Sequence, residues 1–98
     1  MRQDFVIDNT KNDTQVVIIS QRISLEEAQD FCEGFVHLVT MNDSSQFVCN
    51  EDGRKKDGKK LEVNDAATAI LKAQKLYAVP IDGVRGNVLI FKNQARWL

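Results

Sequence analysis

The sequence predicts one α+β domain spanning residues 1–98, in which an antiparallel sheet of three to five strands carries two helices on one of its faces. Three observations predict this class. The chain has 98 residues and is 43% hydrophobic, which suffices for one core. Two segments repeat apolar residues at helical spacing, and short β-branched runs lie around them. From residue 15 the predicted order is β-α-β-β-α-β, a split βαβ-like order, with an extra N-terminal strand before it.

The predicted strands are runs of β-branched and aromatic residues separated by turn formers. The first two form a hairpin, because the segment joining them is rich in Asp, Asn and Thr. The next two are joined by the turn Asn42-Asp43-Ser44, and the last strand follows Gly86. The runs lie at residues 5–7, 16–19, 35–41, 46–49 and 86–91.

Both predicted helices have recognisable ends. Ser24 and Glu27 have the spacing of a capping box, which predicts a helix over 24–33 that stops at Gly34 in the C′ position. Asn64 is the expected N-cap of a second helix over 65–77, which Pro80 stops.

The charges are unevenly distributed along the chain. Residues 1–52 carry a net charge of −7 and residues 53–98 a net charge of +6, although the whole chain carries only −1. Either folding interleaves the two halves and cancels this asymmetry, or the molecule has two oppositely charged surfaces. A total so close to zero gives no global field that would point to nucleic acid or membrane.

A basic loop at residues 54–60 is the most pronounced charged feature. Three interpretations stay open: a mobile solvated loop, a protein-contact surface, or a site for nucleic acid or a nucleotide. Asp65 would repel an anion at the start of the following helix, and no aromatic residues alternate with the bases. The candidate anion-binding residues are Arg54, Lys55, Lys56, Lys59, Lys60 and, in a later loop, Arg85.

The first predicted helix has an acidic face, and the chain has a tryptophan near its end. Like charges three and four residues apart are mildly destabilising on a helix, so this face serves either solubility or a basic partner. Trp97 either docks on the sheet or is exposed as an anchor for a partner. The candidate partner-binding residues are Glu26, Glu27, Asp30, Glu33 and Trp97.

Nothing in the sequence predicts catalysis, a metal or a cofactor. Cys32, His37 and Cys49 are the only soft ligands, and they lack the paired spacing of a zinc site. The glycines around Arg85 have neither of the phosphate-loop spacings. No apolar run is long enough to span a membrane and no secretory signal is recognisable. We therefore expect a cytoplasmic protein with reduced, buried thiols and no enzymatic activity.

Several short motifs are similar to those of a known family. They are the helix start Ser24-Leu25-Glu26-Glu27, the step Gly34-Phe35-Val36, the turn Asn50-Glu51-Asp52-Gly53, the helix start Asn64-Asp65-Ala66-Ala67-Thr68 and the strand start Gly86-Asn87-Val88. On these motifs, residues 4–91 resemble a family of small, uncharacterised phage and mobile-element proteins. The longer basic loop and the tail Arg96-Trp97-Leu98 depart from its pattern. The resemblance implies a fold and a phage context, and no mechanism.

These observations together predict a small phage-type accessory protein that binds a host macromolecule, in the first place a protein, and modulates it. Its location would then be the host cell cytoplasm. Two alternatives stay open. The basic loop 54–60 would serve binding of a nucleotide or nucleic acid. The two charged surfaces would instead pair between copies, giving a homo-oligomer or a ligand-sequestering protein.

Overall fold

The computed structural model describes residues 3–9, 11–74 and 83–97. Within them the chain forms five strands and two α-helices, so the predicted α+β class is confirmed. The strands are β1 (Phe5–Asp8), β2 (Gln15–Ile19), β3 (Val36–Thr40), β4 (Gln46–Asn50) and β5 (Val88–Phe91). The helices are α1 (Leu25–Cys32), α2 (Asp65–Gln74) and a short 3-10 turn at Asn93–Ala95.

The five strands form one sheet in the order β1-β2-β5-β4-β3. Three of the five strands, β1, β3 and β4, have only antiparallel partners. A single pair, β2 with β5, is parallel, with Val16 opposite Val88. The predicted β-α-β-β-α-β order from residue 15 is present along the chain. In space, β5 and β4 both lie between β2 and β3, so two strands separate the ends of the first crossover.

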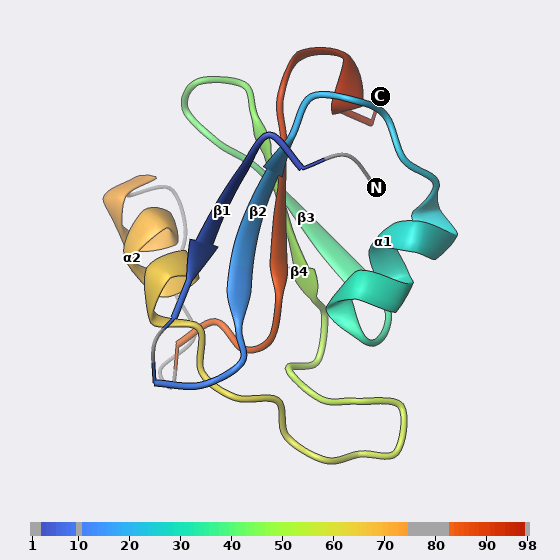
Figure 1. Ribbon diagram of the computed structural model, residues 1–98, viewed down its shortest axis with the longest axis vertical. Coiled ribbons are helices and arrows are strands. Elements are labelled where there is room, and N and C mark those ends of the chain that lie inside the picture. Colours follow the sequence, from blue (N-terminus) through green and yellow to red (C-terminus); the bar gives the residue numbers. More distant parts are fainter. Residues whose placement is uncertain (1–2, 10, 75–82, 98) are drawn as a thin grey trace.

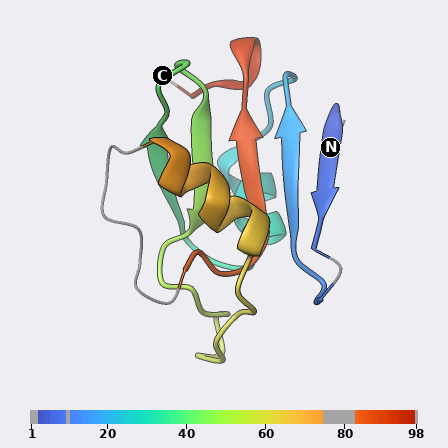
Figure 2. The same ribbon diagram turned by 90° about the vertical axis from the view of Figure 1, so that its left-hand side faces the viewer.

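The two helices lie on opposite faces of the sheet, so the prediction that both cover one face is wrong (Figures 1 and 2). Ala28 and Cys32 of α1 pack with Val17, Leu89 and their neighbours. Ala67 and Leu71 of α2 pack with Val16, Val88 and Ile90. Successive residues of β2 and β5 point to opposite faces, and both faces of these strands are apolar. A sheet of this kind needs a cover on each side.

The helix starts follow the sequence. Ser24 Oγ accepts a hydrogen bond from Glu27 N at 3.1 Å, as expected of an N-cap. Asn64 caps α2 through a 3.0 Å bond from Ala67 N, and its Nδ2 donates to the carbonyls of Gln15 and Gly86. Asn64 is fully buried, so one side chain joins the start of α2 to β2 and to the approach to β5. The last predicted turn of this helix, 75–77, and Pro80 lie outside the described residues.

Candidate functional site

The acidic residues of α1 lie on its exposed side. Ala28 and Cys32 anchor the helix to the sheet, which leaves Glu26, Glu27, Asp30 and Glu33 at the surface. Asp30 and Glu33 lie in the last turn or just beyond it, whereas Glu26 and Glu27 lie in the first turn. The acidic residues therefore form two pairs, one at the start of α1 and one at its end.

The end of α1 differs from the prediction. Glu33, and not Gly34, takes the left-handed conformation, with φ of 63°, and Gly34 N donates to Gln29 O at 3.0 Å. Gly34 is required for another reason. A Cβ at this position would lie 2.7 Å from Nδ2 of Asn50, so the Asn50 side chain occupies the space that any other residue would need.

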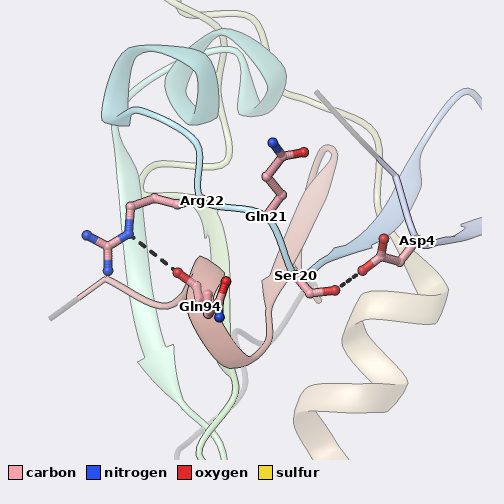
Figure 3. Close-up of a pocket in the computed structure, with 5 residues that line it drawn as sticks. All are labelled: Asp4, Ser20, Gln21, Arg22 and Gln94. Atoms are coloured by element: carbon pink, nitrogen blue, oxygen red, sulfur yellow. Dashed lines mark hydrogen bonds between the residues drawn. The ribbon is translucent and has the colours of Figure 1, made fainter.

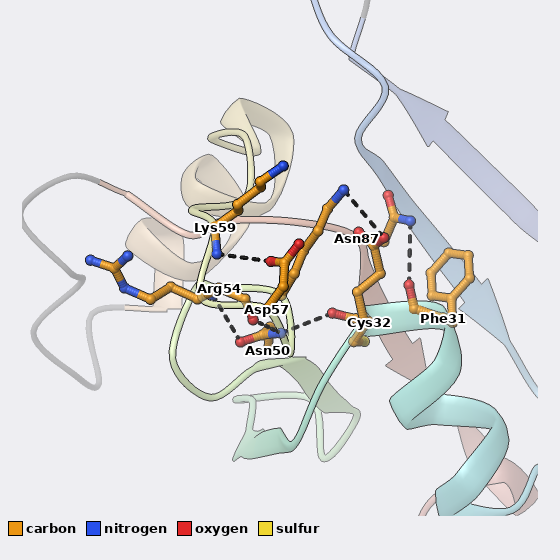
Figure 4. A network of polar contacts seen from close by, with 9 residues as sticks. Phe31, Cys32, Asn50, Arg54, Asp57, Lys59 and Asn87 are labelled. Carbon is orange, nitrogen blue, oxygen red and sulfur yellow. Dashed lines mark hydrogen bonds and ion pairs between the residues drawn. The ribbon is translucent and has the colours of Figure 1, made fainter.

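Asn50 holds the end of α1 against the basic segment (Figure 4). Its Nδ2 donates to Cys32 O at 3.0 Å and to Arg54 O at 2.9 Å. Its Oδ1 accepts from the backbone amides of Asp52 and Gly53 at 2.9 and 2.8 Å. A buried amide with these four partners sets the course of the turn 50–54. Asn50 is the structural residue that reasoning from the sequence missed; the turn motif Asn50-Glu51-Asp52-Gly53 was its signal.

The basic segment 54–60 is a hydrogen-bonded hairpin, which we call the basic hairpin. Lys55 N donates to Lys59 O at 2.9 Å, and Arg54 pairs with Lys60 as an isolated bridge. Arg54 Nη1 also donates to Gly58 O at 2.8 Å. Main-chain bonds thus define the backbone from which its lysines project, and the three interpretations of this segment stay open.

Arg85 braces the base of the basic hairpin. Its Nη1 donates to Leu61 O at 2.8 Å, and its side-chain carbons cover Gly53. Leu61 is buried and its amide donates to Gly53 O, which closes the hairpin. Arg85 is therefore a support of the hairpin, and its role as an anion contact stays a prediction. The side chains of Lys55, Lys56, Lys59 and Lys60 remain at the surface.

The end of α1 and the basic hairpin meet in one groove. Lys55 Nζ lies 4.0 Å from Glu33 Oε1, and each side chain is about half exposed. This pair separates two hollows of about 330 and 590 Å³ and lines both of them. We call the two hollows together the bipolar groove. Its charged lining residues are Lys11, Asp13, Asp30, Glu33, Lys55, Lys56, Asp57, Lys60 and Glu62.

The bipolar groove brings charges from both halves of the sequence together. Asp13, Asp30 and Glu33 come from the acidic half, and most of the basic lining comes from the other half. Five predicted site residues meet here: Asp30, Glu33, Lys55, Lys56 and Lys60. The other six, Glu26, Glu27, Arg54, Lys59, Arg85 and Trp97, are not among its lining residues. The two charged surfaces are thus neighbours, and folding interleaves them at this place.

Trp97 is docked on its own sheet. Its ring centroid lies 4.8 Å from that of Phe91, and its Nε1 donates to Ile23 O at 3.2 Å. The amide of Gln46 bonds both the N–H and the carbonyl of Trp97. With its ring and polar atoms engaged in this way, Trp97 does not act as a free anchor for a partner, and we remove it from the candidate surface.

The thiols and the histidine do not form a reactive set. Cys32 packs on the α1 face and Cys49 on the α2 face, and both are free. Burial, then Cys49 and Glu33, raise the pKa of Cys32 to about 12, and burial raises the pKa of Cys49 to about 11. His37 lies opposite Cys49 on the neighbouring strand. A thiol with so high a pKa stays protonated and is a poor nucleophile.

A third hollow, of about 730 Å³, lies at the other end of the sheet (Figure 3). Asp4, Ser20, Gln21, Arg22 and Gln94 line it. Ser20 Oγ donates to the Asp4 carboxylate, and Arg22 donates to the carbonyls of Gln94 and Arg96. These polar groups satisfy one another. The Ser20 hydroxyl has the Asp4 carboxylate as its partner, and the five lining residues include no histidine that could complete a nucleophile–base–orienter set.

Neither a metal site nor a membrane helix is found in the part of the chain that the structure describes. Residues 3–9, 11–74 and 83–97 contain no group of three or more His, Cys, Asp or Glu side chains arranged to hold a metal ion. In the same residues, no helix has the length and apolar character needed to cross a membrane. The remaining candidate site among the described residues is the bipolar groove.

Comparison with protein-family models, with curated proteins and with solved structures finds no match. The resemblance to small phage and mobile-element proteins therefore stays a prediction from short motifs.

Proposed function

We propose that this protein is a small accessory protein of the phage type, which binds a host protein in the host cytoplasm through the bipolar groove and modulates that protein. The observation that carries the proposal is that the opposite charges of Glu33 and Lys55 lie 4.0 Å apart between two hollows that both residues line. An alternating charge pattern on a rigid frame gives specificity and a fast association rate, more than raw affinity.

The hydrogen bonds of Asn50, which hold the two sides of the groove together, are the second support for this proposal. Asn50 fixes the acidic and the basic side through bonds to Cys32 O and Arg54 O. The surface is thus organised before a partner arrives, which lowers the entropy lost on binding. Glu33 also keeps a left-handed backbone that glycine would adopt with less strain. Retained strain of this kind is typical of functional positions.

A charge-swap variant tests the proposal. Glu33→Lys combined with Lys55→Glu keeps the net charge and leaves an opposite pair in place, but it inverts the pattern of the groove. Affinity capture from a bacterial lysate with the wild-type chain should retain a host protein that the swap variant loses. Glu26→Lys, on the same helix but outside the groove, is the matched control and should still retain that protein. Equal capture by the swap variant would contradict docking through the groove.

The nucleic-acid alternative is less well supported by the lining of the groove. Acidic residues line it alongside the lysines, so it offers an anion a mixed potential and not a basic channel. Fluorescence anisotropy with single-stranded DNA and RNA, at low and high salt, separates the two functions. Binding that weakens steeply with salt and disappears when Lys55, Lys56, Lys59 and Lys60 are all changed to Ala would replace the protein-binding proposal.

Self-association is separated by light scattering of the pure protein. Glu33 and Lys55 already pair within one chain. Pairing of opposite charges between two copies would therefore stabilise a dimer less than it would if the acidic and basic surfaces were far apart. We expect no association through these charges. An oligomer that the charge-swap variant disrupts would favour self-assembly or ligand sequestration over docking on a host protein.

A further inference from the structure

Strand β3 forms one edge of the sheet, at the margin opposite β1 (Figure 2). Among the described residues it pairs only with β4. The pairing runs without a bulge from Val36 opposite Asn50 to Thr40 opposite Gln46. The outer side of β3 therefore presents a regular row of backbone groups, as a free sheet edge does.

Two hydrogen bonds show which backbone groups of β3 point outward. Glu51 N donates to Phe35 O and Met41 N donates to Ser45 O, each at 2.8 Å, and both bonds continue the register of the ladder. Hydrogen-bonded and non-hydrogen-bonded pairs alternate along an antiparallel ladder, so every second residue between these two bonds faces β4. The N–H and C=O groups that point away from the sheet are those of Val36, Leu38 and Thr40. No hydrogen bond to these groups is found among the described residues.

The side chains of β3 do not protect this edge. Natural edge strands often carry Lys or Pro, or bulge, so that other strands are kept away. Residues 35–41 contain no proline and no charged residue. The other edge is different, because Asp8 carries a charge and the amide of Asp4 bonds Ile18 O although Phe5 is the residue opposite Ile18. The unprotected edge of the sheet is therefore β3.

An exposed aromatic side chain lies at the start of this edge. Phe35 is 71% exposed, more than any other large hydrophobic side chain of the described residues. Its carbonyl is bonded to Glu51 N, and the neighbouring Gly34 packs against the side chain of Asn50. The backbone that carries this ring is thus held in place, while the ring itself is open to solvent.

A second copy of β3 complements this edge. Antiparallel pairing about a two-fold axis at Leu38 would place Val36 opposite Thr40 of the second copy and Leu38 opposite Leu38. This register joins all the outward backbone groups of both strands, because each of these residues would be in a hydrogen-bonded pair. Phe35 would then lie opposite Met41 of the second copy. No like charges meet across the seam, since residues 35–41 are uncharged.

We propose that β3 is a dimerisation surface, at which two copies of this chain join their sheets edge to edge about Leu38. Main-chain hydrogen bonds give the affinity in this mode of recognition, and the uncharged side chains allow the pairing. The contact is isologous, so it uses up both β3 edges and stops at two copies. A seam of one strand is small beside the roughly 1,600 Å² of a standard stable interface, so the dimer is reversible and forms as the protein concentration rises.

Lysines on the edge test the proposal. His37 and Thr40 are exposed, so His37→Lys with Thr40→Lys leaves the core intact. Sedimentation equilibrium should show a monomer–dimer equilibrium for the wild-type chain, and this variant should weaken dimerisation about tenfold or more, because lysines block an edge strand. Gln3→Lys with Phe5→Lys adds the same charge at the other edge and should dimerise as the wild type does. High salt should not weaken the dimer, whereas pairing between acidic and basic surfaces would weaken.

Cysteine cross-linking tests the register. Leu38→Cys should form a disulfide between two copies under mild oxidation, because a hydrogen-bonded pair at the axis holds its Cα atoms about 5.5 Å apart. Thr40→Cys should not, since the two copies of that residue would lie about 14 Å apart along the seam. The native Cys32 and Cys49 are free in the wild type and in both variants, so the wild-type chain under the same oxidation gives the background. A monomer at every concentration, a dimer that only the Gln3→Lys with Phe5→Lys variant loses, or cross-linking of Thr40→Cys as fast as Leu38→Cys would overturn the proposal.

Discussion

Single buried amides connect segments that lie far apart in this sequence. Asn50 joins the end of α1 to the basic hairpin, and Asn64 joins the start of α2 to β2 and to Gly86. Each is buried, and each uses both its donor and its acceptor atoms. Replacement by a residue of the same shape but different hydrogen bonding should therefore be costly.

For Asn50 we predict that the change to Asp lowers the free energy of unfolding by about 2–4 kcal/mol, because two carbonyls lose their donor and face a carboxylate. Chemical denaturation monitored by circular dichroism measures this. Asn42→Asp is the matched control. Asn42 is exposed and its side chain makes one bond, to Gln74 O, so the loss there should be within about 1 kcal/mol. An equal decrease in the free energy of unfolding for both variants would mean that the buried hydrogen bonds of Asn50 contribute no more to stability than the exposed bond of Asn42.

The two thiols should make the protein less stable at alkaline pH. Their pKa values in the fold, about 12 and about 11, exceed the ordinary 9.0, so the fold favours the protonated form. The stabilisation is complete below pH 9 and is lost as the pH rises toward the folded values, at up to about 1.4 kcal/mol per pH unit for each thiol. The variant Cys32→Ala with Cys49→Ala should show a flatter decline of unfolding free energy in this range. An unchanged slope would contradict the assignment.

At the scale of the element, the end of α1 carries strain that glycine would relieve. Glu33→Gly should raise the free energy of unfolding by about 1 kcal/mol, because glycine adopts the left-handed conformation without steric cost. The lost pair with Lys55 is half exposed and offsets little of this gain. Glu26→Gly, within α1, should instead lower stability by about 0.5–1 kcal/mol. Thermal unfolding of both variants measures the contrast. A destabilised Glu33→Gly protein would show that the side chain matters more than the backbone.

Helix starts were predictable from the sequence, and the end of α1 was not. Caps such as Ser24 and Asn64 depend on neighbours three residues away, so local patterns suffice. The end of α1 depends on Asn50, which fills the space beside Gly34 and comes from another element. The charged residues of the candidate site were likewise predicted singly. Their meeting in one groove was not, because it follows from the hairpin that Asn50 and Arg85 hold in place.

For the whole molecule, the placement of the helices is the main departure from the sequence prediction. Runs such as Val16–Ile19 and Val88–Phe91 are apolar at every position, which is typical of strands covered on both faces. Alternating apolar and polar residues would have predicted a sheet with one covered face. Uninterrupted apolar runs predict a sheet covered on both faces. The strand runs were identified correctly, but which strands lie at the centre depends on pairing between distant segments, and no local pattern specifies that pairing.

This arrangement predicts a gradient of stability across the sheet. Backbone amides of β2 and β5, which are central and covered on both sides, should exchange with solvent only through global unfolding. Amides of β1 should exchange much faster, through local opening of the edge. Hydrogen exchange followed by NMR measures both. Protection of β1 equal to that of β5 would contradict the place of β1 at the edge of the sheet.

The parallel pairing of β2 with β5 also affects how the protein is made. Val16–Ile19 is translated before α1, β3, β4 and α2, yet the strand beside it, Val88–Phe91, is translated only after them. Until then the apolar strand β2 has β1 but not β5 beside it, and an incompletely paired segment of this kind is prone to aggregate. A nascent chain that stalls before residue 88 would therefore be a substrate for chaperones and proteases, and not a partly working fragment.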